Sequence, residues 1–146
     1  MMKSPFFCTL FLVLTTLSCE VAPAPIDFGN DQCHYCKMMI VDQVHAAQYV
    51  TNKGKQFKFD AIECMVNELR EKGEDNLAIL LVADYGNPGK MIPAREASYL
   101  ISEQIKSPMG AYLSALESTA AAKAVQQKHT GTIHSWSSLS TILKNN

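Results

Sequence analysis

Alternating and helical hydrophobic patterns predict a strand, strand, helix, strand series in the first half of the chain. Residues 44–50 and 56–60 are short runs rich in β-favouring side chains, and the loop between them contains a glycine. Apolar side chains then recur at helical spacing, and the spacing of Asp60 and Glu63 predicts a capping box at the helix start. The apolar run at 77–84 predicts a buried strand that completes the series.

The second half repeats this order of elements. Residues 91–101 are strand-like in parts, with Pro93 expected at a sheet edge or a strand start, and a second short run, 111–116, follows a turn. The alanine-rich stretch 118–129 predicts a helix, and the loosely alternating residues 132–139 predict a closing strand. The sequence therefore predicts an α+β fold of two small ββαβ units that form one compact duplicated domain. The units span residues 31–86 and 87–146.

The first 30 residues lack the strand and helix patterns of the two units and are typical of an export signal followed by a tether. Residues 1–18 carry one early charge, Lys3, and then an apolar run that is too short to span a bilayer comfortably, which predicts a signal peptide for export. Cys19 follows a small residue, as at a lipoprotein processing site, so we expect residues 19–30 to form a lipidated tether. The alternatives are an ordinary secretory signal followed by a chance cysteine, and a retained transmembrane anchor.

Length, composition and charge narrow the class of protein. A length of 146 residues suits one domain, and 47% hydrophobic residues are enough for a packed core. Thirteen basic and 14 acidic side chains leave a formal charge of -1, which argues against nucleic-acid binding. We do not expect an enzyme, because no recognisable motif supplies the hydroxyl, imidazole or paired carboxyl groups that hydrolysis needs.

Cysteine spacing is the most specific chemical feature. With the signal removed and Cys19 acylated, Cys33, Cys36 and Cys64 remain, an odd number that fits poorly with a disulfide framework. A Cys-x-x-Cys pair serves as half of a zinc site, as a redox pair or as a soft-metal site. Lys37 stands where a c-type haem motif has histidine, which excludes haem attachment.

The neighbouring methionines favour a soft metal. Cu(I) binds thioether and thiolate sulfur, whereas a structural zinc site needs four ligands, and the sequence has no second cysteine pair. Met38 is two residues beyond Cys36, so on an extended strand both side chains project to one face and can share an ion. Met109 occupies a Pro-Met-Gly turn, from which a sulfur can be presented to a partner.

The remaining sulfurs and imidazoles have simpler interpretations. We expect Met39, Met65 and Met91 to fill gaps in the core. The histidines are expected at the surface or at helix ends, and His34 is the one closest to the cysteines. Two other functions stay open at this point. One is an exported thiol oxidoreductase that uses its cysteine pair, and the other is a lipoprotein whose second unit binds a protein partner.

Several ordered motifs resemble the nitrous oxide reductase accessory proteins of the NosL family. The family pattern joins a lipoprotein signal to Cys-x-x-Cys-Gly-Met and apolar residues, which residues 33–40 match except that Lys37 replaces the glycine. This lysine places a cation beside the site, and two interpretations stay open: it lowers the pKa of Cys36 by favouring the thiolate, or it marks a relative with another client. The further matches are residues 59–65 at the first helix, 94–99, the Pro-Met-Gly turn 108–110 and the closing segment 131–133.

The resemblance implies a carrier of Cu(I) that is periplasmic and lipid-anchored to a membrane, with a fold of paired ββαβ units. It implies that Cys36, Met38 and Met109 are metal ligands, and it adds Cys33 as a further candidate. It also implies delivery of copper to nitrous oxide reductase, beside an ABC-type membrane complex, by ligand exchange without chemistry on a substrate.

Overall fold

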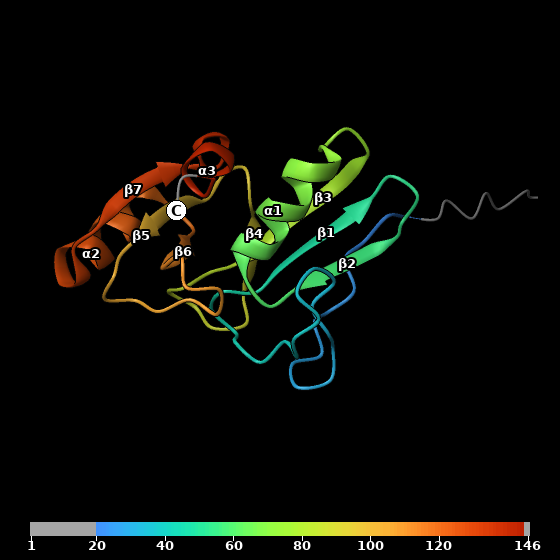
Figure 1. Cartoon of the computed structure of the whole chain (residues 1–146), viewed down its shortest axis with the longest axis horizontal. Coiled ribbons are helices and arrows are strands. Elements are labelled where there is room, and N and C mark those ends of the chain that lie inside the picture. The colour runs from blue at the N-terminus through green and yellow to red at the C-terminus, as the bar shows by residue number, and fades with distance from the viewer. Residues whose placement is uncertain (1–19, 145–146) are drawn as a thin grey trace, which may run out of the picture.

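Two antiparallel sheets, each with a helix packed against it, form the body of the protein (Figure 1). The computed structural model describes residues 20–144. The predicted signal peptide and Cys19 lie outside the described residues. Within residues 20–144, none of the helices has both the length and the apolar character that a membrane crossing requires.

The first sheet has the strand order β2-β1-β3-β4. Its first strand pairs with the second and the third, so the earliest strand of the unit lies in the middle. The helix α1 follows the second strand and packs on one face of the sheet. The elements are β1 Ala47–Thr51, β2 Gln56–Phe59, α1 Ile62–Lys72, β3 Leu77–Ala83 and β4 Met91–Pro93.

The second sheet has the strand order β6-β5-β7, and its first strand is again central. The order of elements and of strands therefore repeats that of β1, β2, α1 and β3, which confirms the α+β fold of two ββαβ units. A last short helix follows the closing strand. The elements are β5 Ser98–Ile101, β6 Leu113–Leu116, α2 Thr119–His129, β7 Thr132–Ser135 and α3 Trp136–Ile142.

A shared core joins the two units. Tyr99 and Leu113 of the second sheet are fully buried in the same apolar cluster as Phe59, Ile62 and Met65 of the first unit. Backbone and side-chain hydrogen bonds also cross between the sheets: the amide of Tyr85 donates to the carbonyl of Ala115 at 2.8 Å, and a ring nitrogen of His45 lies 3.1 Å from the Ser114 hydroxyl. The two units thus fold as one compact body.

Residues 91–101 are strand-like in parts, as predicted: β4 ends at Pro93 at the outer edge of the first sheet, where a residue without an amide hydrogen is tolerated, and β5 begins at Ser98. The last predicted strand differs from the structure. The predicted strand 132–139 ends at Ser135. Trp136 and Leu139 are three residues apart, and helical spacing lets both pack on the core from α3.

The start of α1 is a second difference. Ala61, in extended conformation, is the N-cap residue, and it makes no side-chain cap hydrogen bond. Asp60 accepts hydrogen bonds from cysteine thiols, and Glu63 accepts one from Ser107, so the predicted capping box does not form. Both carboxyl groups are instead buried in contacts with distant segments.

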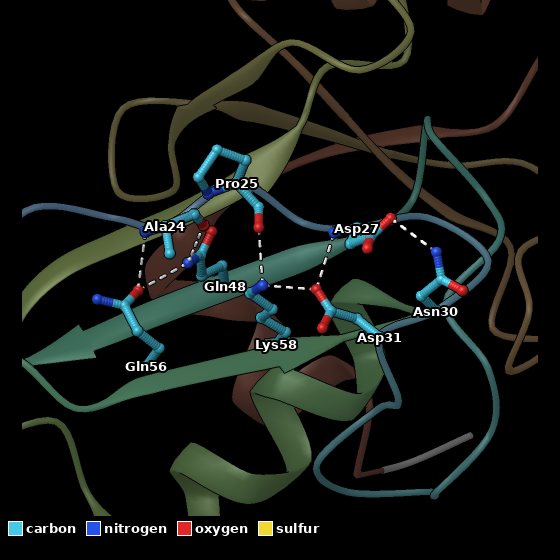
Figure 2. Close-up of polar contacts among 8 residues, drawn as sticks. All are labelled: Ala24, Pro25, Asp27, Asn30, Asp31, Gln48, Gln56 and Lys58. Atoms are coloured by element: carbon cyan, nitrogen blue, oxygen red, sulfur yellow. Dashed lines mark hydrogen bonds and ion pairs between the residues drawn. The ribbon is translucent and has the colours of Figure 1, made fainter.

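The predicted tether is docked on the first sheet over most of its length (Figure 2). Gln48, Gln56 and Lys58 share the face of the sheet opposite α1. Gln56 binds the carbonyl of Ala22 at 2.9 Å and the amide of Ala24 at 3.1 Å, so its single side chain satisfies two backbone groups of the segment.

A lysine completes the docking. Lys58 donates to the carbonyl of Pro25 at 2.7 Å and forms an ion pair with Asp31 at 2.5 Å. Gln48 donates to the carbonyl of Ala24 at 2.8 Å. Ile26, between these contacts, packs against the core. These side chains give the backbone of the segment the hydrogen-bond partners that an isolated extended segment lacks.

Replacing Lys58 with alanine is expected to loosen the N-terminal segment. The change removes both hydrogen bonds of the lysine and leaves the half-buried Asp31 carboxylate without its cation. We expect the free energy of unfolding in urea to fall by about 1–2 kcal/mol, and the amides of residues 27–31 to exchange their hydrogens faster.

The control variant is Lys90→Ala, which removes a lysine–carboxylate pair with Glu117 from the exposed surface, where such pairs contribute little. Equal losses of stability for Lys58→Ala and Lys90→Ala would contradict this role for Lys58.

The pair between Lys58 and Asp31 also depends on pH. The hydrogen bond from Lys58 holds the pKa of Asp31 below its usual value of 3.8. Stabilisation from this pair is therefore present above about pH 3.8 and is lost as the pH falls through the lowered pKa.

Candidate metal centre

Three cysteines and one aspartate converge where the loop of residues 33–38 meets the start of α1. Cys33 and Cys36 come from the loop, Asp60 precedes the helix, and Cys64 lies in its first turn. One potential ligand atom from each of the four lies within 4.8 Å of all the others. Cys33, Asp60 and Cys64 are buried, whereas Cys36 is half-buried and gives the cluster an opening toward solvent.

Backbone hydrogen bonds close the loop that carries the first two cysteines. The amide of Cys33 donates to the carbonyl of Met38 at 2.8 Å, and the amide of Lys37 donates to the carbonyl of Cys33 at 3.1 Å. Lys37 has a φ of 67°, in the left-handed region that favours glycine. The predicted extended strand through Cys36 and Met38 is therefore wrong, because this residue turns the chain between them.

Asp60 organises the thiols. Its Oδ1 accepts hydrogen bonds from the sulfur of Cys36 at 3.2 Å and from the sulfur of Cys64 at 3.4 Å. Asp60 and Cys64 are four residues apart across the helix start, so both side chains can reach the same point. A buried carboxylate needs such donors, and in this protein protons on sulfur supply them.

The thiols differ in their affinity for protons. A hydrogen bond from Cys64 lowers the pKa of Cys33 to about 6. Burial raises the pKa of Cys36 to about 11. The same Cys33–Cys64 hydrogen bond, together with burial, raises the pKa of Cys64. The cluster therefore offers three sulfur donors, of which Cys33 is the most acidic, that can bind a metal ion in exchange for protons.

The methionines of the loop lie at the surface. The Met38 side chain is 54% exposed and that of Met39 is 50% exposed, so the prediction that Met39 fills the core is wrong. Met65 is fully buried on α1, and Met91 packs against the core, as predicted. The sequence alternates polar and apolar residues too weakly around 33–40 to separate an exposed methionine from a buried one.

Met109 lies beside the same helix on a different loop. Its turn is closed by a 3.0 Å hydrogen bond from the Gly110 amide to the Ser107 carbonyl, and its side chain is 40% exposed. The hydroxyl of Ser107 donates to Glu63, a buried residue in the first turn of α1. A shallow pocket of about 200 Å³ lies between this turn and the helix, lined by Glu63, Asn67, Met109, Gly110, Ala111 and Leu143.

The histidines do not join the cluster in the part of the chain that the structure describes. His34 faces the aromatic side chains of β2, with its ring centroid 4.7 Å from that of Phe57, and its Nε2 lies 3.6 Å from a carboxylate oxygen of Glu68. His45 lies 2.8 Å from Asp42 and contacts the second sheet through Ser114.

The sequence left the role of Cys64 open and predicted that Asp60 caps the helix. Two signals point to their shared role: Asp60 and Cys64 flank the helix start at a spacing of four, and the odd number of cysteines leaves one thiol outside any disulfide. What the sequence lacks is any indication that this helix start packs against the Cys-x-x-Cys loop.

A double ββαβ fold with a thiol cluster beside its first helix defines a small protein with a site able to hold a metal ion. The sequence model of the NosL family matches residues 25–142, and the chain therefore belongs to the NosL family. NosL is a non-enzymatic family, which confirms the prediction that this chain is not an enzyme.

A solved structure shares the fold. The crystal structure of the copper chaperone NosL from Shewanella denitrificans superposes with a TM-score of 0.72 at 17% sequence identity, over 84% of this chain and 98% of that chain. At this identity the likeness concerns the fold alone. No curated protein matches the sequence significantly.

Loss of the Cys64 thiol is expected to weaken metal binding as much as loss of Cys36, which was predicted to be a ligand. With Co(II) as a spectroscopic probe of thiolate coordination, Cys64→Ser should lower the affinity at least about tenfold and reduce the sulfur charge-transfer band, because one of three converging thiols is gone.

Met65→Leu is the control for damage to the core. Met65 is fully buried and adjacent on the same helix, and the exchange conserves side-chain volume, so Co(II) affinity should not change. Cobalt binding that is indifferent to Cys64→Ser would show that the four side chains do not act as one site.

Proposed function

We propose that this chain is an exported, lipid-anchored metallochaperone that binds Cu(I) through cysteine and methionine sulfurs. In this proposal it delivers the ion to a copper enzyme, nitrous oxide reductase, and works beside an ABC-type membrane complex. The observation that carries the proposal is the convergence of Cys33, Cys36 and Cys64 at one partly open point of a NosL-family fold. The solved relative described as a copper chaperone supports the choice of cargo.

Sulfur chemistry favours copper over zinc at this point. Three thiols and one carboxylate are enough ligands for a closed zinc site. Two methionines favour copper: Met38 is exposed two residues beyond Cys36, and Met109 is exposed on a turn that shares a pocket with Glu63 of α1. Thioethers bind Cu(I) well and zinc poorly. Exposed methionines contribute little to packing, and we propose that cargo transfer is their role.

Transfer then proceeds by exchange of ligands. Cys33, Cys36 and Cys64 hold the ion, and Met38 and Met109 are the outer donors that meet it first and release it last. A client thiol, thioether or imidazole replaces these donors one at a time, so the ion is never free and its charge does not change. Protons displaced from the thiols on loading return on release.

The rival function, a thiol oxidoreductase, fits the site less well. Such enzymes attack with an accessible thiolate of low pKa. In this chain the cysteine with the lowered pKa, Cys33, is 1% exposed, whereas the more accessible Cys36 has a raised pKa. The two functions differ in a disulfide-reduction assay: only a thiol oxidoreductase would reduce a protein disulfide at a rate that falls when either Cys33 or Cys36 is replaced.

Met38→Ala and Met109→Ala are each expected to weaken Cu(I) binding about tenfold with all thiols intact, because each removes one sulfur donor. The measurement is competition for Cu(I) against a chromogenic chelator under reducing conditions. Met39→Ala is the control, since Met39 is on the same loop and equally exposed but is not an expected ligand.

Two results would contradict the proposal. One is a wild-type chain that does not compete with the chelator, and the other is a Cu(I) affinity that zinc abolishes at equal concentration. A Cu(I) affinity that depends on the cysteines but is equal for the methionine variants and the control would restrict the site to the thiol cluster.

The lipid anchor is tested at Cys19. Cys19→Ala should appear in the soluble extract of the exported fraction and lack the mass of acyl chains, whereas the unchanged protein fractionates with membranes. Cys8→Ala, inside the predicted signal peptide, is the control and should leave acylation intact. Membrane association that survives Cys19→Ala would favour a retained apolar anchor instead.

A further inference from the structure

The docked N-terminal segment restricts how the body can sit on a membrane. Ala22 is the first residue bound to the sheet, through its carbonyl and the side chain of Gln56. Gln56 opens β2, next to the loop that joins β1 to β2. Figure 1 shows the blue N-terminal segment reaching the body beside this β1–β2 hairpin.

Only a few chain atoms separate this point from the proposed acylation site. Three Cα–Cα steps join Cys19 to Ala22, which span at most about 11 Å. A folded domain of this size is roughly 35 Å across, three times the length of that connection. An anchor at Cys19 therefore holds the hairpin side of the body at the bilayer surface, and the body cannot turn another side toward it without undocking the segment.

The surface at the hairpin suits lipid headgroups. A hollow of about 400 Å³ is lined by Thr51, Asn52, Lys53, Lys55, Phe57 and Asn76. The two lysines are exposed, and within residues 20–144 neither has a carboxylate at ion-pair distance. Lysine ammonium and asparagine amide groups donate hydrogen bonds to phosphate oxygens, so this hollow offers donors to the phosphodiester of a headgroup.

We propose that the hairpin surface, made of residues 51–55 and Asn76, lies against the membrane, with Lys53 and Lys55 among the lipid phosphates. This inference rests on the proposed acylation of Cys19. The partner is the bilayer surface itself.

The consequence concerns the thiol cluster. β2 runs from Gln56 at the hairpin to Phe59, and Asp60 follows directly. Four residues of extended chain cover about 13 Å, so the cluster lies that much farther along the strand from the membrane-facing end. The half-buried Cys36 then opens to the aqueous side, where a soluble client can reach it.

Lysine acetylation of the acylated chain in vesicles tests the orientation. The chain is reconstituted in vesicles of phosphatidylethanolamine and phosphatidylglycerol, and acetylation rates are read by mass spectrometry against the same chain in detergent. Lys53 and Lys55 should react at least about threefold more slowly in vesicles, because lipid covers them. Lys123 and Lys128, exposed on α2, are the controls and should react equally in both.

A longer connection provides the matched variant. A 12-residue Gly-Ser spacer between Glu20 and Val21 leaves the docked segment intact and lets the body move away from the surface, so protection of Lys53 and Lys55 should fall and Cu(I) affinity should stay unchanged. Alkylation of Cys36 should proceed at the same rate in vesicles and detergent.

The outcomes separate the two claims. An acylated chain in which Lys123 is slowed as much as Lys53, or in which Lys53 is not slowed, would overturn the orientation and leave the copper proposal standing. A chain whose mass shows no acyl group would overturn both the anchor and the orientation. A chain that is acylated and oriented but does not bind Cu(I) would overturn the copper proposal alone.

Discussion

A single buried carboxylate, Asp60, connects the chemistry of this protein to its fold. Asp60 lies between the last residue of β2 and the start of α1, and its carboxylate accepts hydrogen bonds from thiols on two separate segments. A carboxylate with 2% exposure requires such donors, and the thiols in turn are held near one another by sharing it. The interaction thus keeps Cys36, on a surface loop, against Cys64, in the core.

The same arrangement explains how a site for a soft metal can persist without the metal. Thiol protons hold Cys36 and Cys64 together through Asp60, with Cys33 beside them, and a metal ion takes over when it displaces those protons. Because the scaffold is a packed double ββαβ core and not the metal, loading and release need not unfold the chain. A carrier requires this property, whereas a structural metal site does not.

Hydrophobic periodicity predicted most of the fold, because each strand and helix with one buried face must repeat its apolar residues at the matching period. It failed where local patterns are ambiguous. Residues 132–139 alternate only loosely, so the predicted strand ran past Ser135, whereas Trp136 and Leu139 pack on the core from a helix at a spacing of three. The docking of residues 22–31 escaped prediction because its partners, Gln48, Gln56 and Lys58, are far away in the sequence. Asp60 escaped for the same reason: a capping role is local, whereas its thiol partner Cys36 lies 24 residues away.

X-ray absorption at the copper edge of the chain loaded with one Cu(I) reports directly on the ligands of the ion. If the thiol cluster binds copper, the first coordination shell is made of sulfur alone and loses one sulfur in Cys64→Ser. A shell dominated by nitrogen or oxygen, or one that is the same with and without Cys64, would rule out binding at this cluster.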